Sequence, residues 1–133
     1  MMGVETIFDQ QVRSFLVACS MLSSIIGTHR LHEAANDKSY IFDNDEVEHA
    51  IRKVYKAYDN IDVNTLDNIW DTDAISNLIS LIENAQPKIS KAVLFAHSMD
   101  ILNRDDILEA LSFESNSMED LKEELNDRLD FLE

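Results

Sequence analysis

Apolar residues recur at spacings of three and four through the first segment of the chain, from about Val4 to Ile26. This spacing is the period of an α-helix. The apolar positions cover well over half of the helix circumference, which is a wider arc than a surface helix buries. We therefore expect either the central helix of the domain or a helix that buries a second face against another copy. Gly27 is expected to end it, because glycine forms a left-handed C-terminal cap without strain.

The same period continues along the rest of the chain in shorter segments. Breaks are expected at residues that favour turns or helix ends, namely around Asp59, at Asp71-Thr72-Asp73, before Pro87, at Asn103-Arg104-Asp105 and at Ser115-Asn116-Ser117. Side chains suited to N-terminal capping stand at the expected helix starts, which are Asn44 or Asp45, Asn64, Asp105 and Asn116. The pattern predicts an all-α fold. The expected architecture is a single compact bundle of six or seven helices around the apolar N-terminal helix, with residues 1–133 as one domain.

Composition supports this class. The chain has 133 residues with only two Gly and one Pro, whereas sandwiches, barrels and doubly wound sheets need these residues at their many turns. A chain of about 130 residues buries enough surface for a core without disulfides or a metal. Cys19 has no second cysteine to pair with, so a reducing compartment, the cytoplasm, is expected.

We expect neither a secretory signal nor a membrane span at the N-terminus. A signal needs a basic leader before its apolar core, but Glu5 and Asp9 outnumber Arg13 in the residues that precede Cys19. Serines interrupt the apolar stretch well short of the roughly 18 apolar residues that a spanning helix requires.

The chain is strongly acidic, with 26 Asp and Glu against 11 Lys and Arg and a net charge of −15. Residues 1–40 carry −1, whereas residues 41–86 and 87–133 carry −7 each. Such a surface repels nucleic-acid phosphates and anionic lipid, so neither nucleic acid nor membrane is expected as a direct partner. It attracts a basic protein surface. The acidic runs near the C-terminus are candidate partner-binding residues, although a merely solvating role is the alternative; they are Glu119, Asp120, Glu123, Glu124 and Asp127.

The last six residues, Arg128-Leu129-Asp130-Phe131-Leu132-Glu133, form the most specific short element. They resemble the terminal peptides by which some phage transcription co-activators and polymerases dock on sliding clamps, where a Leu-Asp-Phe-Leu core fills an apolar pocket. The resemblance implies a docking role for Leu129, Phe131 and Leu132. The alternative is an ordinary helix end, which leaves Phe131 unexplained because it lies off the leucine stripe.

No catalytic, cofactor or metal site is predicted. The sequence has no nucleophile elbow and no Gly-rich phosphate loop, and Cys19 lies on the apolar arc without a basic neighbour to activate it. His29, His32 and Glu33 have a spacing that metal ligands use on a helix, so a metal-dependent enzyme remains the second alternative. Residues 60–71 have the outline of an EF-hand calcium loop but lack its glycine and its final glutamate.

Together these observations favour a non-enzymatic acidic module that binds, and inhibits or masks, a basic protein surface. Toxin immunity proteins, anti-defence proteins and DNA-mimic inhibitors share this profile as a class. The first alternative is a helical transcription or replication adaptor that docks a clamp or polymerase through its C-terminal peptide. A homodimer through the N-terminal helix is also expected, since that helix has more apolar circumference than so small a domain covers.

Overall fold

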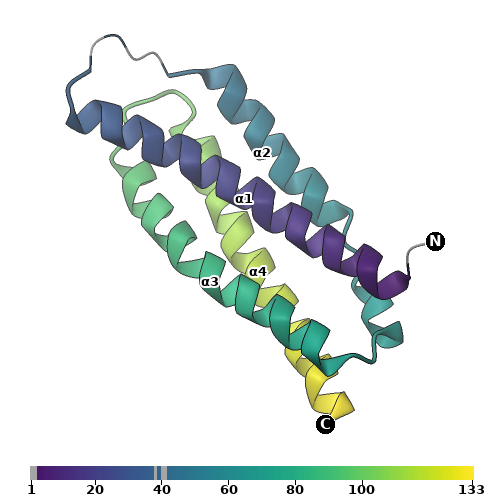
Figure 1. The fold of residues 1–133 in the computed structure, drawn as a ribbon. Coiled ribbons are helices and arrows are strands. Elements are labelled where there is room, and N and C mark those ends of the chain that lie inside the picture. Colours follow the sequence, from purple (N-terminus) through teal and green to yellow (C-terminus); the bar gives the residue numbers. More distant parts are fainter. Residues whose placement is uncertain (1–2, 38, 40–41) are drawn as a thin grey trace.

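The protein is a bundle of helices (Figure 1). Its structure is a computed structural model that describes residues 3–37, 39 and 42–133. These residues form four α-helices and one 3₁₀ helix, which are α1 (Val4–Ala34), α2 (Asn44–Asp59), η1 (Val63–Asn68), α3 (Thr72–His97) and α4 (Arg104–Leu132). The predicted all-α class is confirmed, whereas the predicted six or seven helices are too many.

The four α-helices run alternately up and down the bundle (Figure 1). α1 packs on α2 and on α3, while α4 packs on α3 and more sparsely on α2. The connection from α2 to α3 crosses one end of the bundle, where η1 contacts both α1 and α4. Two antiparallel hairpins, α1–α2 and α3–α4, therefore lie side by side, with α1 parallel to α3 and α2 parallel to α4.

One contiguous apolar core fills the space between the helices. Each long helix buries a stripe of side chains at the helical period; on α1 these are Phe8, Val12, Phe15, Ala18, Cys19, Leu22 and Ile26, and on α4 they are Ile107, Ala110, Leu111, Met118, Leu121 and Leu125. α1 is thus one wall of the bundle, and the prediction that the other helices surround it is wrong. Its extra apolar positions, Val17 and Met21 among them, stay exposed. The stretch Thr6–Ala34 has the length and hydropathy of a membrane-spanning helix, a test that core helices of soluble proteins and signal sequences also pass.

The prediction that α1 ends at Gly27 is wrong, because the helix continues to Ala34. No neighbouring group lies within 4 Å of the position that a Cβ on Gly27 would occupy, so packing does not require glycine there. The helix ends where Asn36 adopts a left-handed φ of 53°, which asparagine tolerates better than most residues. The Asp37 N–H then donates to the His32 carbonyl at 3.0 Å and closes the last turn.

Two predicted breaks lie inside continuous helices. α3 runs through Pro87, because Ile82 and Ile89 on either side of it are both buried in the same core. α4 runs through Ser115-Asn116-Ser117, where Ser117 is itself buried and Met118 continues the apolar stripe. Burial of a stripe along the whole helix outweighs the weak helix propensity of single residues.

Capping places the other helix starts close to the predicted positions. The Asp43 carboxylate accepts two backbone N–H groups of the first turn of α2 at 3.0 and 3.1 Å. Asp71 caps α3 in the same way at 3.0 and 3.3 Å. The helix predicted to begin at Asn64 is the 3₁₀ helix η1, which Asp62 caps.

Replacing Pro87 by alanine is expected to raise the free energy of unfolding by about 1–2 kcal/mol. Proline lacks the N–H that an inner helix position donates, and alanine restores it, although the freer unfolded chain offsets part of the gain. Urea denaturation followed by circular dichroism measures the change. The exposed neighbour gives the control, Lys88→Ala, with an expected change within about 0.5 kcal/mol. A Pro87→Ala protein less stable than the wild type contradicts this account of α3.

Candidate partner-binding surface

The acidic residues predicted to bind a partner are all exposed on α4, but they do not form one patch. Glu119 faces α3, because its Oε1 accepts a hydrogen bond from Gln86 Nε2 at 2.5 Å and lies 3.3 Å from Lys122 Nζ. The hydrogen bonds from Gln86 and then Lys122 hold the pKa of Glu119 below its usual value. Glu119 therefore already has partners within the protein. Glu123 and Asp127 are exposed on the same helix.

Asp120 and Glu124 lie on the opposite edge of α4, beside α2. Their carboxylates act on Tyr58, a half-buried side chain of α2, whose pKa is raised by burial first and by these two charges next. Phe113 of α4 packs against the Tyr58 ring at 5.4 Å between centroids, and Phe15 of α1 also contacts this ring, at 5.2 Å. Aromatic contacts thus hold α2 against α4 where these carboxylates stand.

A hollow of about 430 Å³ opens further along the same edge, between α2 and α4. Its rim carries three carboxylates and one cation, which are Glu48, Asp106, Glu109 and Arg52. Tyr55 forms part of its wall. Burial raises the pKa of Tyr55, and the charges of Glu109 and Asp106 raise it further.

We call these five carboxylates the α2/α4 acidic face; they are Glu48, Asp106, Glu109, Asp120 and Glu124. Sequence reasoning found only the last two. The other α4 acids have the spacing of one continuous helical stripe, which is the signal that could have found them. The predicted break at Ser115-Asn116-Ser117 hid that stripe, because it divided α4 into two helices of unrelated orientation.

The C-terminal peptide forms the last turn of α4. Leu129 and Leu132 are half-buried and pack against the core. Phe131 is 69% exposed, and the Arg128 guanidinium lies 5.0 Å from the centre of its ring. The same guanidinium lies 4.6 Å from the Trp70 ring and donates to two backbone carbonyls at the end of η1, at 3.0 and 3.1 Å. Arg128 therefore ties the end of the chain to the α2–α3 connection, a contact that the sequence did not indicate.

Glu114 is the one acidic side chain of the described residues that is fully buried, with 0% of its surface exposed. Neither carboxyl oxygen has a well-formed hydrogen bond among the described residues. Burial raises the pKa of Glu114 to about 7, and the nearby Cys19 thiol opposes this rise. Glu114 occupies a position of the α4 apolar stripe between Leu111 and Met118, a signal that the predicted helix break also hid.

Cys19 meets Glu114 across the core, from α1 to α4. Burial raises the pKa of Cys19, and the Glu114 carboxyl raises it further. A thiol in this state is a poor nucleophile, because the reactive form is the thiolate. The pair is thus suited to a protonated, uncharged state within the core.

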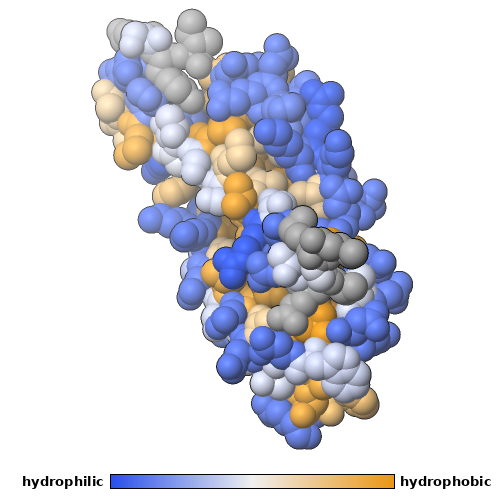
Figure 2. Space-filling view, turned by 45° about the vertical axis from the view of Figure 1, so that its right-hand side comes forward, coloured by the Kyte–Doolittle hydropathy of each residue, from blue (hydrophilic) through white to orange (hydrophobic). Residues whose placement is uncertain are grey.

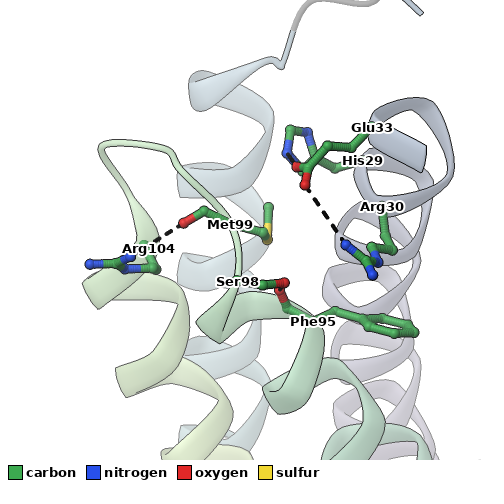
Figure 3. A network of polar contacts seen from close by, with 7 residues as sticks. All are labelled: His29, Arg30, Glu33, Phe95, Ser98, Met99 and Arg104. Carbon is green, nitrogen blue, oxygen red and sulfur yellow. Dashed lines mark hydrogen bonds and ion pairs between the residues drawn. The ribbon is translucent and has the colours of Figure 1, made fainter. Parts of the chain in front are cut away.

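The two histidines of the proposed metal cluster point to different carboxylates at one end of the bundle. His29 Nε2 lies 2.9 Å from Glu33 Oε2, and Arg30 also faces Glu33 (Figure 3). His32 Nδ1 lies 2.9 Å from Asp37 Oδ2. Among the described residues no group of three or more His, Cys, Asp or Glu side chains converges.

The oxygen-rich residues 60–71 that resemble a calcium loop lie at helix ends. Asn60 follows the last residue of α2, Asp62 caps η1 and Asp71 caps α3. Two of these three side chains therefore accept hydrogen bonds from backbone N–H groups, which accounts for their spacing without a metal.

No protein-family model matches the chain, and comparison with curated proteins and with solved structures finds no significant match.

Replacing Glu114 by glutamine is expected to remove a pH dependence of stability. The folded-state pKa of about 7 lies above the ordinary 4.5, so the folded state holds the proton more tightly and stability falls as pH rises from about 4.5 to 7. The loss amounts to about 3 kcal/mol at pH 8. Glu114→Gln should therefore match the wild type at pH 4.5 and exceed it by up to about 3 kcal/mol at pH 8.

Urea denaturation at several pH values measures this difference. The exposed Glu83→Gln is the control for the loss of one charge, and its difference from the wild type should not change with pH. A constant difference for Glu114→Gln would show that the buried carboxyl does not titrate in this range.

Proposed function

We propose that this protein is a non-enzymatic interaction module that binds a basic protein surface with its α2/α4 acidic face and thereby inhibits or masks that surface. The observation that carries the proposal is the hollow beside Tyr55, where the carboxylates of Glu48, Asp106 and Glu109 outnumber the single cation, Arg52. A lysine or arginine of a partner that enters this hollow would gain charge-assisted hydrogen bonds. A guanidinium would also stack on the tyrosine ring.

Two further features favour this face over the Glu119 edge of α4. Glu119 already interacts with Gln86 and Lys122, so a partner would have to displace them. The α2/α4 acidic face also combines charge with half-buried aromatic side chains, and aromatic residues supply much of the energy of protein interfaces. The net charge of −15 adds long-range attraction that speeds encounter with a cationic protein.

An inhibitor of the proposed class would cover a cationic site on its target; toxin immunity proteins, anti-defence proteins and DNA mimics share its acidic profile as a class. Such a role needs a rigid carrier of charge and no reactive group. The buried, protonated state that Cys19 and Glu114 favour is compatible with a carrier of this kind.

Neutralising the hollow with Glu48→Gln, Asp106→Asn and Glu109→Gln together is expected to weaken binding of a basic partner at least about tenfold. An arginine-rich synthetic peptide serves as the probe, with calorimetry in low and in moderate salt, and partner capture from the native host follows. Glu119→Gln with Glu123→Gln is the control on the other edge of α4 and should weaken binding much less. Binding that ignores salt, or that both sets of variants weaken equally, would count against the α2/α4 acidic face.

The adaptor that docks a clamp or polymerase is the alternative function, and the exposure of Phe131 is the observation that favours it. Phe131→Ala tests it better than deletion of residues 129–133, because Leu129 and Leu132 pack against the core. If the peptide docks on a clamp, this variant should lose partner capture. The acidic-face proposal expects capture to survive. Leu102→Ala, which changes another highly exposed apolar residue, is the control.

A further inference from the structure

The outer face of α1 and α2 carries apolar side chains that no helix of the bundle covers. Val17 is 58% exposed and Met21 is 43% exposed. Two hollows share these residues, one of about 550 Å³ and one of about 470 Å³. Figure 2, which brings the α2 side forward, shows apolar side chains in a band with hydrophilic residues on both sides. Arg13 lies in the first hollow and is already paired with Asp9 at 2.7 Å.

The two hollows differ in charge. Lys53 and Lys56 of α2 line the first, and the described residues that line it include no acid. Asp43 and Glu46, at the start of α2, line the second hollow. The described residues that line this hollow include no Lys or Arg. The α1/α2 face, as we call this surface, therefore has a basic end and an acidic end, with the exposed apolar pair between them.

We propose that the α1/α2 face binds a second copy of the chain in a symmetric dimer, with both helices antiparallel to their counterparts. The two-fold axis of this dimer lies in the interface and runs perpendicular to the helices. It therefore places the basic end of one copy against the acidic end of the other. Along α2, the position halfway between Glu46 and Lys53 is also halfway between Asp43 and Lys56, and it lies just before Ala50. A single axis at that level therefore brings both pairs of opposite charges together at once.

The same axis brings the exposed apolar residues of α1 together. Phe15 contacts Tyr58 and His29 contacts Phe42, so the level just before Ala50 corresponds to about residue 22 of α1. Met21, which lines both hollows, therefore lies close to the axis. An axis at Met21 sets Val17 opposite Ile25 of the second copy. Ser20 and Ser24 flank Met21 in the second hollow, and side chains this small let two helices approach closely.

The size of the face is consistent with a dimer of modest affinity. α2 is roughly 24 Å long at 1.5 Å per residue, and two helices packed side by side are roughly 20 Å wide. The face then offers roughly 500 Å² per copy, or about 1,000 Å² in all, which is near the lower limit for a specific interface. We expect a dissociation constant in the micromolar range.

This dimer does not depend on the proposed function, and the two use different surfaces. Glu48 and Arg52 line the hollow on the α4 side of α2, whereas Glu46 and Lys53 line the hollows on the α1 side. Binding of a basic partner and self-association can therefore fail independently.

Sedimentation of the full chain tests the proposal at concentrations up to roughly 100 µM, where a micromolar dimer is populated. Moderate salt screens the repulsion between two acidic molecules. The wild type should sediment as a dimer. Met21→Glu and Lys53→Glu should each raise the dissociation constant at least about tenfold, while circular dichroism confirms that both variants fold.

Charge exchange distinguishes this register from any other. Glu46→Lys and Lys53→Glu should each raise the dissociation constant at least about tenfold, because each alone places like charges together. An equimolar mixture of the two should dimerise as the wild type does. In the mixed dimer, position 46 of each chain meets position 53 of the other, and both contacts pair a lysine with a glutamate. Effects within a single chain cannot produce this rescue.

Two variants outside the face serve as controls. Arg52→Glu changes the neighbour of Lys53 that faces α4, and Leu102→Glu changes an apolar residue that is 94% exposed elsewhere. Both should dimerise as the wild type does. A wild type that stays monomeric, a dimer that Met21→Glu leaves intact, or a mixture without rescue would each overturn the proposal. If the face binds a helix of another protein instead of a second copy, the wild type alone should stay monomeric, which is the first of these outcomes.

Discussion

The burial of one apolar stripe on each of four helices is the interaction on which the rest of the structure depends. A chain with a net charge of −15 repels itself when it becomes compact, so the core must supply enough stabilisation to exceed that repulsion as well as the loss of chain entropy. Because the stripes are continuous, the helices that carry them are continuous too. This explains why α3 does not stop at Pro87 and why α4 does not stop at its Ser-Asn-Ser segment.

Burial of the apolar stripes also determines where the charged side chains lie. Side chains that do not fit the stripes lie on the outside, where the positions of neighbouring helices decide which charges stand together. Carboxylates of α2 and α4 gather along their shared edge, where a hollow remains between them. The lysines of α2 stand instead beside the uncovered apolar residues of α1. The acidity that dominates the sequence is therefore uneven on the surface, and α2 contributes to two faces of different character.

Much of the fold follows from the sequence alone. The helical period predicted the all-α class, and the break expected at Asp71-Thr72-Asp73 lies at the start of α3. The number of helices and the position of α1 did not follow, because local propensity says nothing of how far a buried stripe extends or which arc of a wide apolar helix its neighbours cover. The charge of −7 given for residues 87–133 also includes Glu114, although its place between Leu111 and Met118 is a core position. The pairing of acids from α2 and α4 depends on which helices are neighbours, and no periodicity within one helix contains that information.

The crossing of η1 over the end of the bundle has a consequence for how the molecule assembles. It makes the protein two helical hairpins joined by one connection, and each hairpin closes over a shorter stretch of chain than the contacts between hairpins require. Contacts of short sequence separation form early in folding, so each hairpin is a natural unit of assembly and their docking comes afterwards. Cys19 belongs to the first hairpin and Glu114 to the second. Their meeting therefore belongs to the docking step, in which the carboxyl leaves water only as the two halves close on each other.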